Sequence, residues 1–177
     1  MAPVPAIRLA TPEDAAMLAV LKRTTFRETF VEGFAIPYPP ADMARFEEAT
    51  YGLAQVAAEL ADPAHATWVV EGEGGTLVAY AHAGPCKLPH DDVREGELEL
   101  YQLYMQRDLK GAGLGRALME RALGWMEGRA PGRHWLGVWS GNDRAQRFYA
   151  RFGFEQVGTY DFAVGDHRDH EFIWRRG

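Results

Sequence analysis

The stretch from Leu103 to Leu123, LYMQRDLKGAGLGRALMERAL, places three glycines at alternate positions directly before an apolar helical pattern. Residues 97–105 before it alternate like a long strand, and residues 113–127 carry apolar side chains at helical spacing. Glycine lets a ligand approach the backbone closely, and the first N–H groups of a helix have no partner within that helix. This order of elements indicates an anion-binding loop, with a tight turn that holds no ligand as the alternative.

Two familiar nucleotide motifs do not fit this loop. A P-loop closes with Gly-Lys-Ser/Thr, whereas Gly115 is followed here by Arg116 and Ala117. A dinucleotide-binding fingerprint needs a third glycine at the position of Arg116. Both nucleotide interpretations are therefore disfavoured.

Length and composition narrow the class of protein further. A chain of 177 residues, 47% of them hydrophobic, predicts one compact domain over residues 1–177. Its net charge of -6 disfavours a nucleic-acid surface, which needs clustered Lys and Arg. No window approaches ~20 uninterrupted apolar residues, and the N-terminal segment lacks the regions of a signal peptide, so we expect neither a membrane span nor secretion. The single cysteine, Cys86, fits a reducing cytoplasm.

The pattern of turns, caps and apolar spacing predicts alternating helices and strands. We expect Asn142 to cap one helix, Gly153 to end it, and Gly52 to interrupt another helical region. The expected helices cover residues 12–29, 42–60, 113–127 and the segment after 142, and the expected strands cover 7–9, 67–71, 76–83, 97–105, 134–139, 155–163 and 170–175, with a turn at 165–169.

Two segments together carry a family resemblance. The loop Lys110 to Gly115 resembles the Gln/Arg-x-x-Gly-x-Gly/Ala loop of the GNAT superfamily of acetyl-CoA-dependent N-acetyltransferases: Gly113 and Gly115 match, while Lys110 departs from the usual Gln or Arg. Residues 135–158, WLGVWSGNDRAQRFYARFGFEQVG, resemble its second signature, a strand followed by Asn-x-x-Ala-x-x-Phe-Tyr and Gly-Phe. More loosely, the chain is similar to bacterial acetyltransferases of the spermidine/spermine type.

The resemblance implies an α/β (α+β) fold: a mixed, mostly antiparallel sheet of six or seven strands with helices on both faces. It implies that acetyl-CoA binds along the glycine loop, with backbone N–H groups around the CoA pyrophosphate. The resemblance also implies that the thioester and pantetheine lie near the bulged end of the strand at residues 97–105. It implies that Asn142 contacts pantetheine, and Arg151 is a weaker candidate for binding the 3′-phosphate of CoA. The implied cofactor-binding residues are Leu103, Tyr104, Met105, Lys110, Gly111, Ala112, Gly113, Leu114, Gly115, Arg116, Asn142 and Arg151.

Acetyl transfer to an amine needs a proton acceptor, because an alkylamine of pKa ~10.4 is mostly protonated at neutral pH. Glu97 and Glu99 share one face of the strand at residues 97–105 by period two. By resemblance, Glu99 occupies the position of the base, and an ion-pair or solvated role is an equally weighted alternative. For Glu97 we favour the ion pair or solvated face.

The departing CoA thiolate needs a proton donor. By resemblance, Tyr149 occupies the general-acid position, and a phenol of ordinary pKa ~10 is chemically suited to it. The alternative is packing, because Tyr149 also belongs to an apolar helical stripe with Phe148 and Phe152.

The expected acceptor is a primary amine, with polyamines or other small amines leading. Amines of proteins or peptides are the rival acceptors, and a non-catalytic acyl-CoA sensor is the rival class of function. We expect no metal site, because His167 and His170 have no third ligand at suitable spacing. The aromatic-rich final hairpin is a candidate surface for a homodimer.

Overall fold

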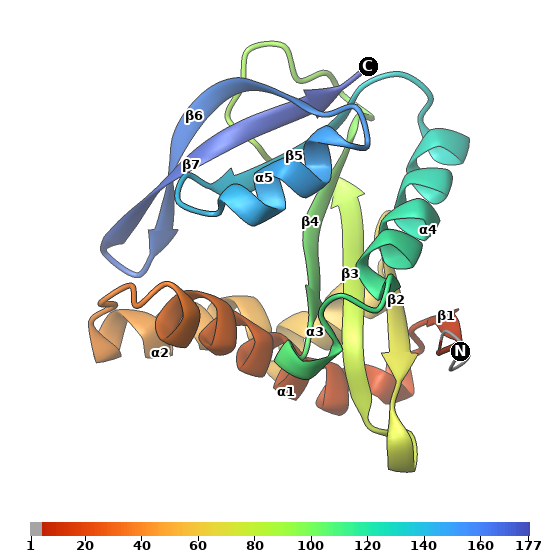
Figure 1. Ribbon diagram of the computed structural model, residues 1–177, viewed down its shortest axis with the longest axis vertical. Helices are drawn as coiled ribbons and strands as arrows, with labels where there is room; N and C mark the ends of the chain where they lie inside the picture. Colours follow the sequence, from red (N-terminus) through yellow and green to blue (C-terminus); the bar gives the residue numbers. More distant parts are fainter. Residues whose placement is uncertain (1–4) are drawn as a thin grey trace.

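The computed structural model of the protein describes residues 5–177 and contains a seven-stranded sheet in the order β1-β2-β3-β4-β5-β7-β6 (Figure 1). Neighbouring strands are antiparallel except for the central pair, β4 and β5. The expected mixed, mostly antiparallel sheet is therefore confirmed. The strands are β1 Ile7–Leu9, β2 Ala66–Glu71, β3 Leu77–Pro85, β4 Leu98–Met105, β5 His134–Trp139, β6 Glu155–Val164 and β7 His167–Arg176.

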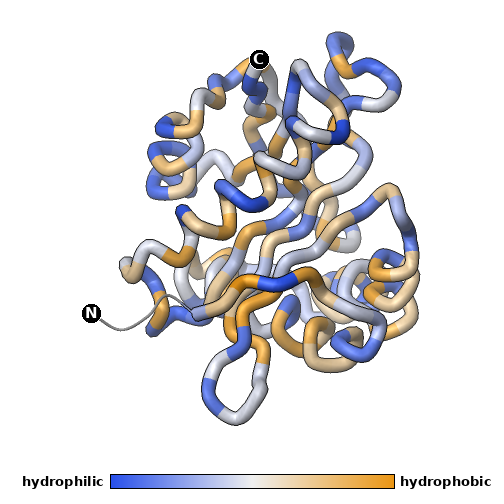
Figure 2. The backbone as a smooth tube through the Cα atoms, turned by 90° about the vertical axis from the view of Figure 1, so that its right-hand side faces the viewer, coloured by the Kyte–Doolittle hydropathy of each residue, from blue (hydrophilic) through white to orange (hydrophobic). Residues whose placement is uncertain are grey.

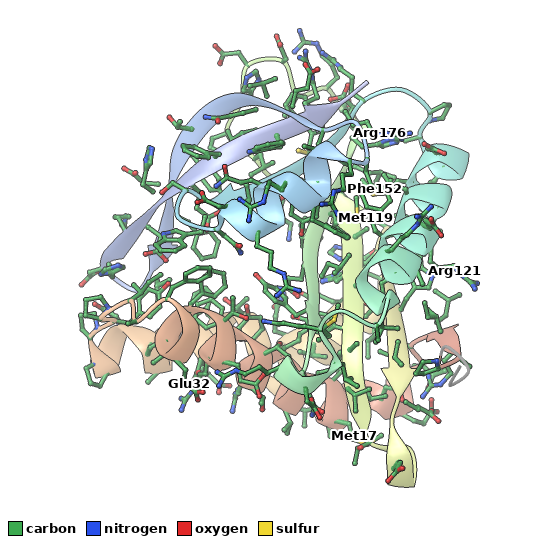
Figure 3. The ribbon with its side chains drawn as sticks, in the orientation of Figure 1. Met17, Glu32, Met119, Arg121, Phe152 and Arg176 are labelled. Carbon is green, nitrogen blue, oxygen red and sulfur yellow. The ribbon has the colours of Figure 1, made fainter. Side chains whose placement is uncertain are left out.

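Helices cover both faces of the sheet, as expected. One face packs against α1 and α3 through Val69, Leu77 and Tyr80, and the other packs against α4. Figure 3 shows Met119 on the side of α4 that faces the sheet and Arg121 on its outer side, and Met119 is fully buried. The α-helices are α1 Ala15–Phe26, α2 Pro40–Tyr51, α3 Leu53–Ala61, α4 Leu114–Arg129 and α5 Asp143–Ala150.

Two helix boundaries follow the local signals in the sequence. Gly52 has extended backbone angles between α2 and α3, and a Cβ there would clash with the Glu48 carbonyl oxygen. The Asn142 side chain accepts a hydrogen bond from the Ala145 N–H at 3.0 Å, which caps α5. Both expectations are confirmed.

Two expected boundaries were wrong. The first helix was expected over residues 12–29, but a 3₁₀ turn at Pro12–Asp14 precedes α1, and a π-helical segment, Arg27–Gly33, extends it. The turn expected at 165–169 is shorter, because β7 begins at His167 and Asp169 is a buried strand residue. Its carboxylate is compensated by hydrogen bonds from Tyr38 and His167, which the local polarity of the segment did not reveal.

The pairing between β4 and β5 ends early. Leu98–Leu100 pair with His134–Leu136, whereas β4 continues to pair with β3 as far as Met105. A bulge in β4 leaves Tyr101 without a partner on β3, and bulges increase the bend and twist of a strand. Figure 1 shows β5, β7 and β6 turned away from β2, β3 and β4 as a result.

The diverging half of the sheet is supported at its far end by α2. Figure 1 shows the β6–β7 turn beside α2, where the Asp166 N–H donates to the Asp42 carboxylate at 3.0 Å. This contact between segments far apart in the sequence ties the diverging half of the sheet to α2.

Figure 2 shows the opposite end of the molecule, where the β2–β3 turn is hydrophilic between apolar strand segments.

Within residues 5–177, no helix is long and apolar enough to span a bilayer. The expectation that the N-terminus carries no targeting signal rests partly on residues 1–4, which lie outside the described residues.

The core position Leu118 on α4 gives a test of this packing. Leu118 is fully buried, so Leu118→Ala leaves a cavity and is expected to lower the free energy of unfolding by about 2–5 kcal/mol. Leu53→Ala on α3 is the matched control, because Leu53 is 55% exposed, and it is expected to have a much smaller effect. Urea unfolding of both variants measures the difference, and equal losses would contradict the placement of α4.

Candidate active site

A cavity of about 420 Å³ lies where β4 and β5 part. Both diverging strands line it, through residues 99–104 of β4 and residues 137–139 of β5, and α5 closes one side. Its four ionisable carboxyl groups come from three separate segments, α3, β4 and β7, and its basic residues are a single lysine and a single histidine. These groups are Glu59, Glu99, Asp169, Glu171, Lys87 and His82.

The glycine loop presents a row of backbone donors at the start of α4. Gly111 and Gly113 have φ of 99° and 78°, in the left-handed region, and no atom lies within 4 Å of a Cβ placed on either. Within the described part of the chain, none of the N–H groups of residues 111–116 has a hydrogen-bond acceptor; the first to find one is Ala117, which donates to Gly113 at 3.1 Å. The loop is therefore built to receive an anion.

Basic side chains surround this loop. Partial burial and the neighbouring charges of Arg144 and Arg107 lower the pKa of Lys110, which indicates that these three cations lie near one another. Arg116 instead extends along the helix and pairs with Glu120 at 2.7 Å. The loop thus combines unpaired N–H groups with positive charge, and its residues fit a phosphate group of CoA.

Glu99 is a buried carboxyl group in the cavity wall. Its exposure is 8%, and it accepts one hydrogen bond, from the Lys87 N–H at 2.9 Å. Burial, with a smaller contribution from the charge of Glu171, raises the pKa of Glu99 to about 7. A carboxyl group with such a pKa is suited to take up and release protons near neutral pH.

Glu97 behaves differently although it lies two residues away. Its carboxylate accepts hydrogen bonds from Arg133 at 2.8 Å and from the Trp135 indole at 2.7 Å. The ion-pair interpretation of Glu97 is confirmed, and the pKa of Glu97 is lowered.

Glu171 on β7 was missed by the sequence analysis. It lines the same cavity as Glu99, and its carboxylate accepts a hydrogen bond from the Tyr160 hydroxyl at 2.7 Å. Burial raises the pKa of Glu171 to about 7, against the opposing effect of Tyr160. The segment HRDHEF begins with five consecutive polar residues, and no local signal distinguishes Glu171 from the exposed Arg168 and His170.

Asn142 and Tyr149 approach the cavity from α5. They lie seven residues apart, with Ala145 between them, and all three line the cavity on one face of the helix. Burial raises the pKa of Tyr149 to about 12, so its hydroxyl keeps its proton at neutral pH. The ring also packs 5.4 Å from that of Phe148, so packing and a chemical role coexist at this position.

Of the three expected residues at the end of β4, Leu103 and Tyr104 line the cavity and Met105 does not. Met105 instead packs against Gly115, where a Cβ would lie 3.1 Å from the Met105 Cε. Arg151 is exposed at the end of α5, with no ion pair to another residue in the range 5–177. In the same range, no group of three or more His, Cys, Asp or Glu side chains is arranged to hold a metal ion.

Comparison with known proteins identifies the family. A model of the acetyltransferase (GNAT) family matches residues 23–154. The chain belongs to the GNAT family. It is 32% identical over 157 residues to an uncharacterised N-acetyltransferase of Lactobacillus delbrueckii subsp. lactis, covering 85% of this chain and 86% of that protein. It is 35% identical over 147 residues to an uncharacterised N-acetyltransferase of Mycobacterium tuberculosis, covering 81% of this chain and 89% of that protein.

Solved structures show the same fold. The PaiA N-acetyltransferase from Thermoplasma acidophilum in complex with coenzyme A has a TM-score of 0.74 and 18% identity, covering 97% of each chain. A ribosomal-protein-alanine N-acetyltransferase from Brucella melitensis has a TM-score of 0.64 and 21% identity, covering 97% of this chain and 98% of that one. On the family match and the two relatives above 30% identity, this GNAT protein is an acetyl-CoA-dependent N-acetyltransferase, and acetyl-CoA supplies the acetyl group.

The burial of Glu99 predicts a pH-dependent stability. Its pKa is about 7 in the folded protein against 4.5 ordinarily, so the folded state binds more protons between these values and loses stability as the pH rises through them. Glu99→Gln removes this loss, because Gln does not titrate. The free energy of unfolding of Glu99→Gln, relative to that of the wild type, is therefore expected to be about 3 kcal/mol higher at pH 8 than at pH 4.5. Urea unfolding at both pH values measures this gain. The exposed Glu155→Gln serves as control, and a pH-independent difference for Glu99→Gln would contradict the assignment.

Proposed function

We propose that this GNAT enzyme transfers the acetyl group directly to the primary amine of a small cationic acceptor, with polyamines as the leading class. The observation that carries the proposal is the charge of the cavity. Glu59, Glu99, Asp169 and Glu171 line it, against the single lysine Lys87. Such a lining attracts an ammonium group and disfavours an anionic acceptor.

On this proposal, acetyl-CoA lies across the parting of β4 and β5. The unpaired N–H groups of residues 111–116 hold its pyrophosphate, and Lys110 supports them with charge. The pantetheine runs past Leu103 and Tyr104 towards Asn142, with Met105 behind them supporting the loop. Arg151 is the candidate for the 3′-phosphate, supported by its exposure and its position at the end of α5.

The proton transfers follow from the positions of Glu99 and Tyr149. The bound ammonium gives one proton to the ionised Glu99 carboxylate, and the neutral amine attacks the thioester carbonyl carbon. As the C–S bond breaks, Tyr149 gives its proton to the sulfur and is reprotonated by the second proton that leaves the nitrogen. The amide keeps the third proton, and the proton on Glu99 leaves to water. The pKa of Tyr149, about 12, supports its role as a donor that stays protonated until the thiolate forms.

We further propose that residues 1–177 form one acetyltransferase domain and that the reaction takes place in the cytoplasm. The half-buried Cys86 has no cysteine partner, which supports a reducing compartment. The β6–β7 hairpin stays our candidate surface for a homodimer.

The first test is CoA release across a panel of acceptors, with acetyl-CoA binding measured by calorimetry. We expect spermidine, spermine or putrescine to give the highest kcat/KM. Peptides with N-terminal alanine and lysine peptides test the rival protein acceptors, which the name of the Brucella neighbour brings into consideration. Turnover of peptides alone would overturn the small-amine proposal, and tight acetyl-CoA binding without turnover of any amine would favour a sensor.

A second test addresses Tyr149. Tyr149→Phe removes the proposed proton donor while the ring keeps its packing, so kcat is expected to fall about a hundredfold while acetyl-CoA affinity changes little. Tyr80→Phe is the control, because Tyr80 is a buried tyrosine that does not line the cavity. Steady-state kinetics and calorimetry on both variants separate the two effects. Undiminished turnover in Tyr149→Phe would remove the acid role.

A further inference from the structure

Two carboxyl groups from distant strands share the wall of the cavity. Glu99 lies on β4 beside the last residues that pair with β5, and Glu171 lies on β7, opposite Trp139 of β5. Both line the cavity, and the charge of Glu171 contributes to the raised pKa of Glu99. The charge of Glu171 therefore acts on Glu99 across the end of β5.

A glycine between them makes room for this arrangement. Gly137 lies on β5 between Trp135, which pairs with Glu99, and Trp139, which pairs with Glu171. A Cβ at Gly137 would lie 2.5 Å from the Tyr160 hydroxyl and 3.3 Å from Glu171 Oε2. The Tyr160–Glu171 hydrogen bond thus occupies the space that the missing side chain leaves open, and it fixes the Glu171 carboxylate against β5.

The groups around the pair leave few competing charges. The charges that act on the pair are those of Lys87, which approaches Glu99, and Asp169, which approaches Glu171. Glu59 and His82 line the same cavity. The pKa values of the surrounding phenols are raised, chiefly by burial, so these groups are uncharged at neutral pH; they belong to Tyr38, Tyr51, Tyr101, Tyr104 and Tyr160. The Cys86 thiol is likewise kept protonated by burial, which raises its pKa to about 12.

We infer that Glu171, held by Tyr160, is a second acceptor-binding residue that holds the ammonium form of the acceptor while Glu99 takes its proton. An ionised Glu171 attracts the ammonium, and its charge strengthens the hold of Glu99 on the transferred proton. When the proton moves from nitrogen to Glu99, the repulsion between the two carboxylates disappears. The inference rests on the proposed function, because it requires an amine acceptor in this cavity.

Removal of the Glu171 charge tests the inference. In Glu171→Gln, kcat/KM for putrescine or spermidine is expected to fall about a hundredfold, with an unchanged KM for acetyl-CoA. Because Glu99 then loses its like-charged neighbour, its pKa falls, and the acid limb of the pH profile is expected to move to lower pH. Glu171→Asp, which restores the charge, is expected to recover part of the activity.

Tyr160→Phe provides an independent variant that keeps both carboxyl groups. Without the phenolic donor, the ionised form of Glu171 is less stable and the pKa of Glu171 rises. Because the inference requires both carboxylates to be ionised, the acid limb then follows Glu171 and is expected to move to higher pH, opposite to the effect of Glu171→Gln. Glu155→Gln on β6 is the control, because Glu155 is exposed and does not line the cavity.

Profiles of kcat/KM from pH 5.5 to pH 9 decide between the outcomes. Opposite displacements of the acid limb in Glu171→Gln and Tyr160→Phe would support the inference. If the wild type acetylates amines and both variants behave like Glu155→Gln, the inference is wrong while the proposed function stands. If the wild type acetylates no amine, the proposed function fails first and the inference falls with it.

Discussion

The early end of the β4–β5 pairing is the constraint on which the rest of the site depends. Two parallel strands that stayed paired to their ends would bury the space between them. Here the pairs stop at Leu100 and Leu136, while β4 continues to pair with β3 beyond a bulge at Tyr101. The cavity, the approach of α5 and the room for Glu171 all follow from this parting.

The site combines two environments that need different physical conditions. The glycine loop lies at the surface, where unpaired N–H groups and basic side chains hold an anion without a deep pocket. The carboxyl groups lie inside the cavity, where the loss of water raises the pKa of Glu99 and Glu171 to about 7. An acetyltransferase uses both, because it binds a highly charged donor and deprotonates an ammonium.

Sequence reasoning succeeded where the determining interactions are local. The break at Gly52 and the cap at Asn142 each depend on atoms a few residues away, and both appear as expected. It failed where partners are distant: the polarity of the segment around Asp169 suggested a turn, but Tyr38, far away in the sequence, satisfies that carboxylate inside the protein. The π-helical extension of α1 at residues 27–33 had no signal in the apolar spacing.

The sequence by itself determined the order of elements, the glycine loop before α4 and the family to which the chain belongs, because each is written in contiguous residues. It also supplied Glu99 and Tyr149 as candidates by position in family motifs. Only the tertiary structure decided that Glu97 is an ion-pair partner, that Glu99 is buried and that Glu171 joins it. The physical reason is that desolvation and charge coupling are sums over neighbours from several strands and helices, and those neighbours are assembled only by folding.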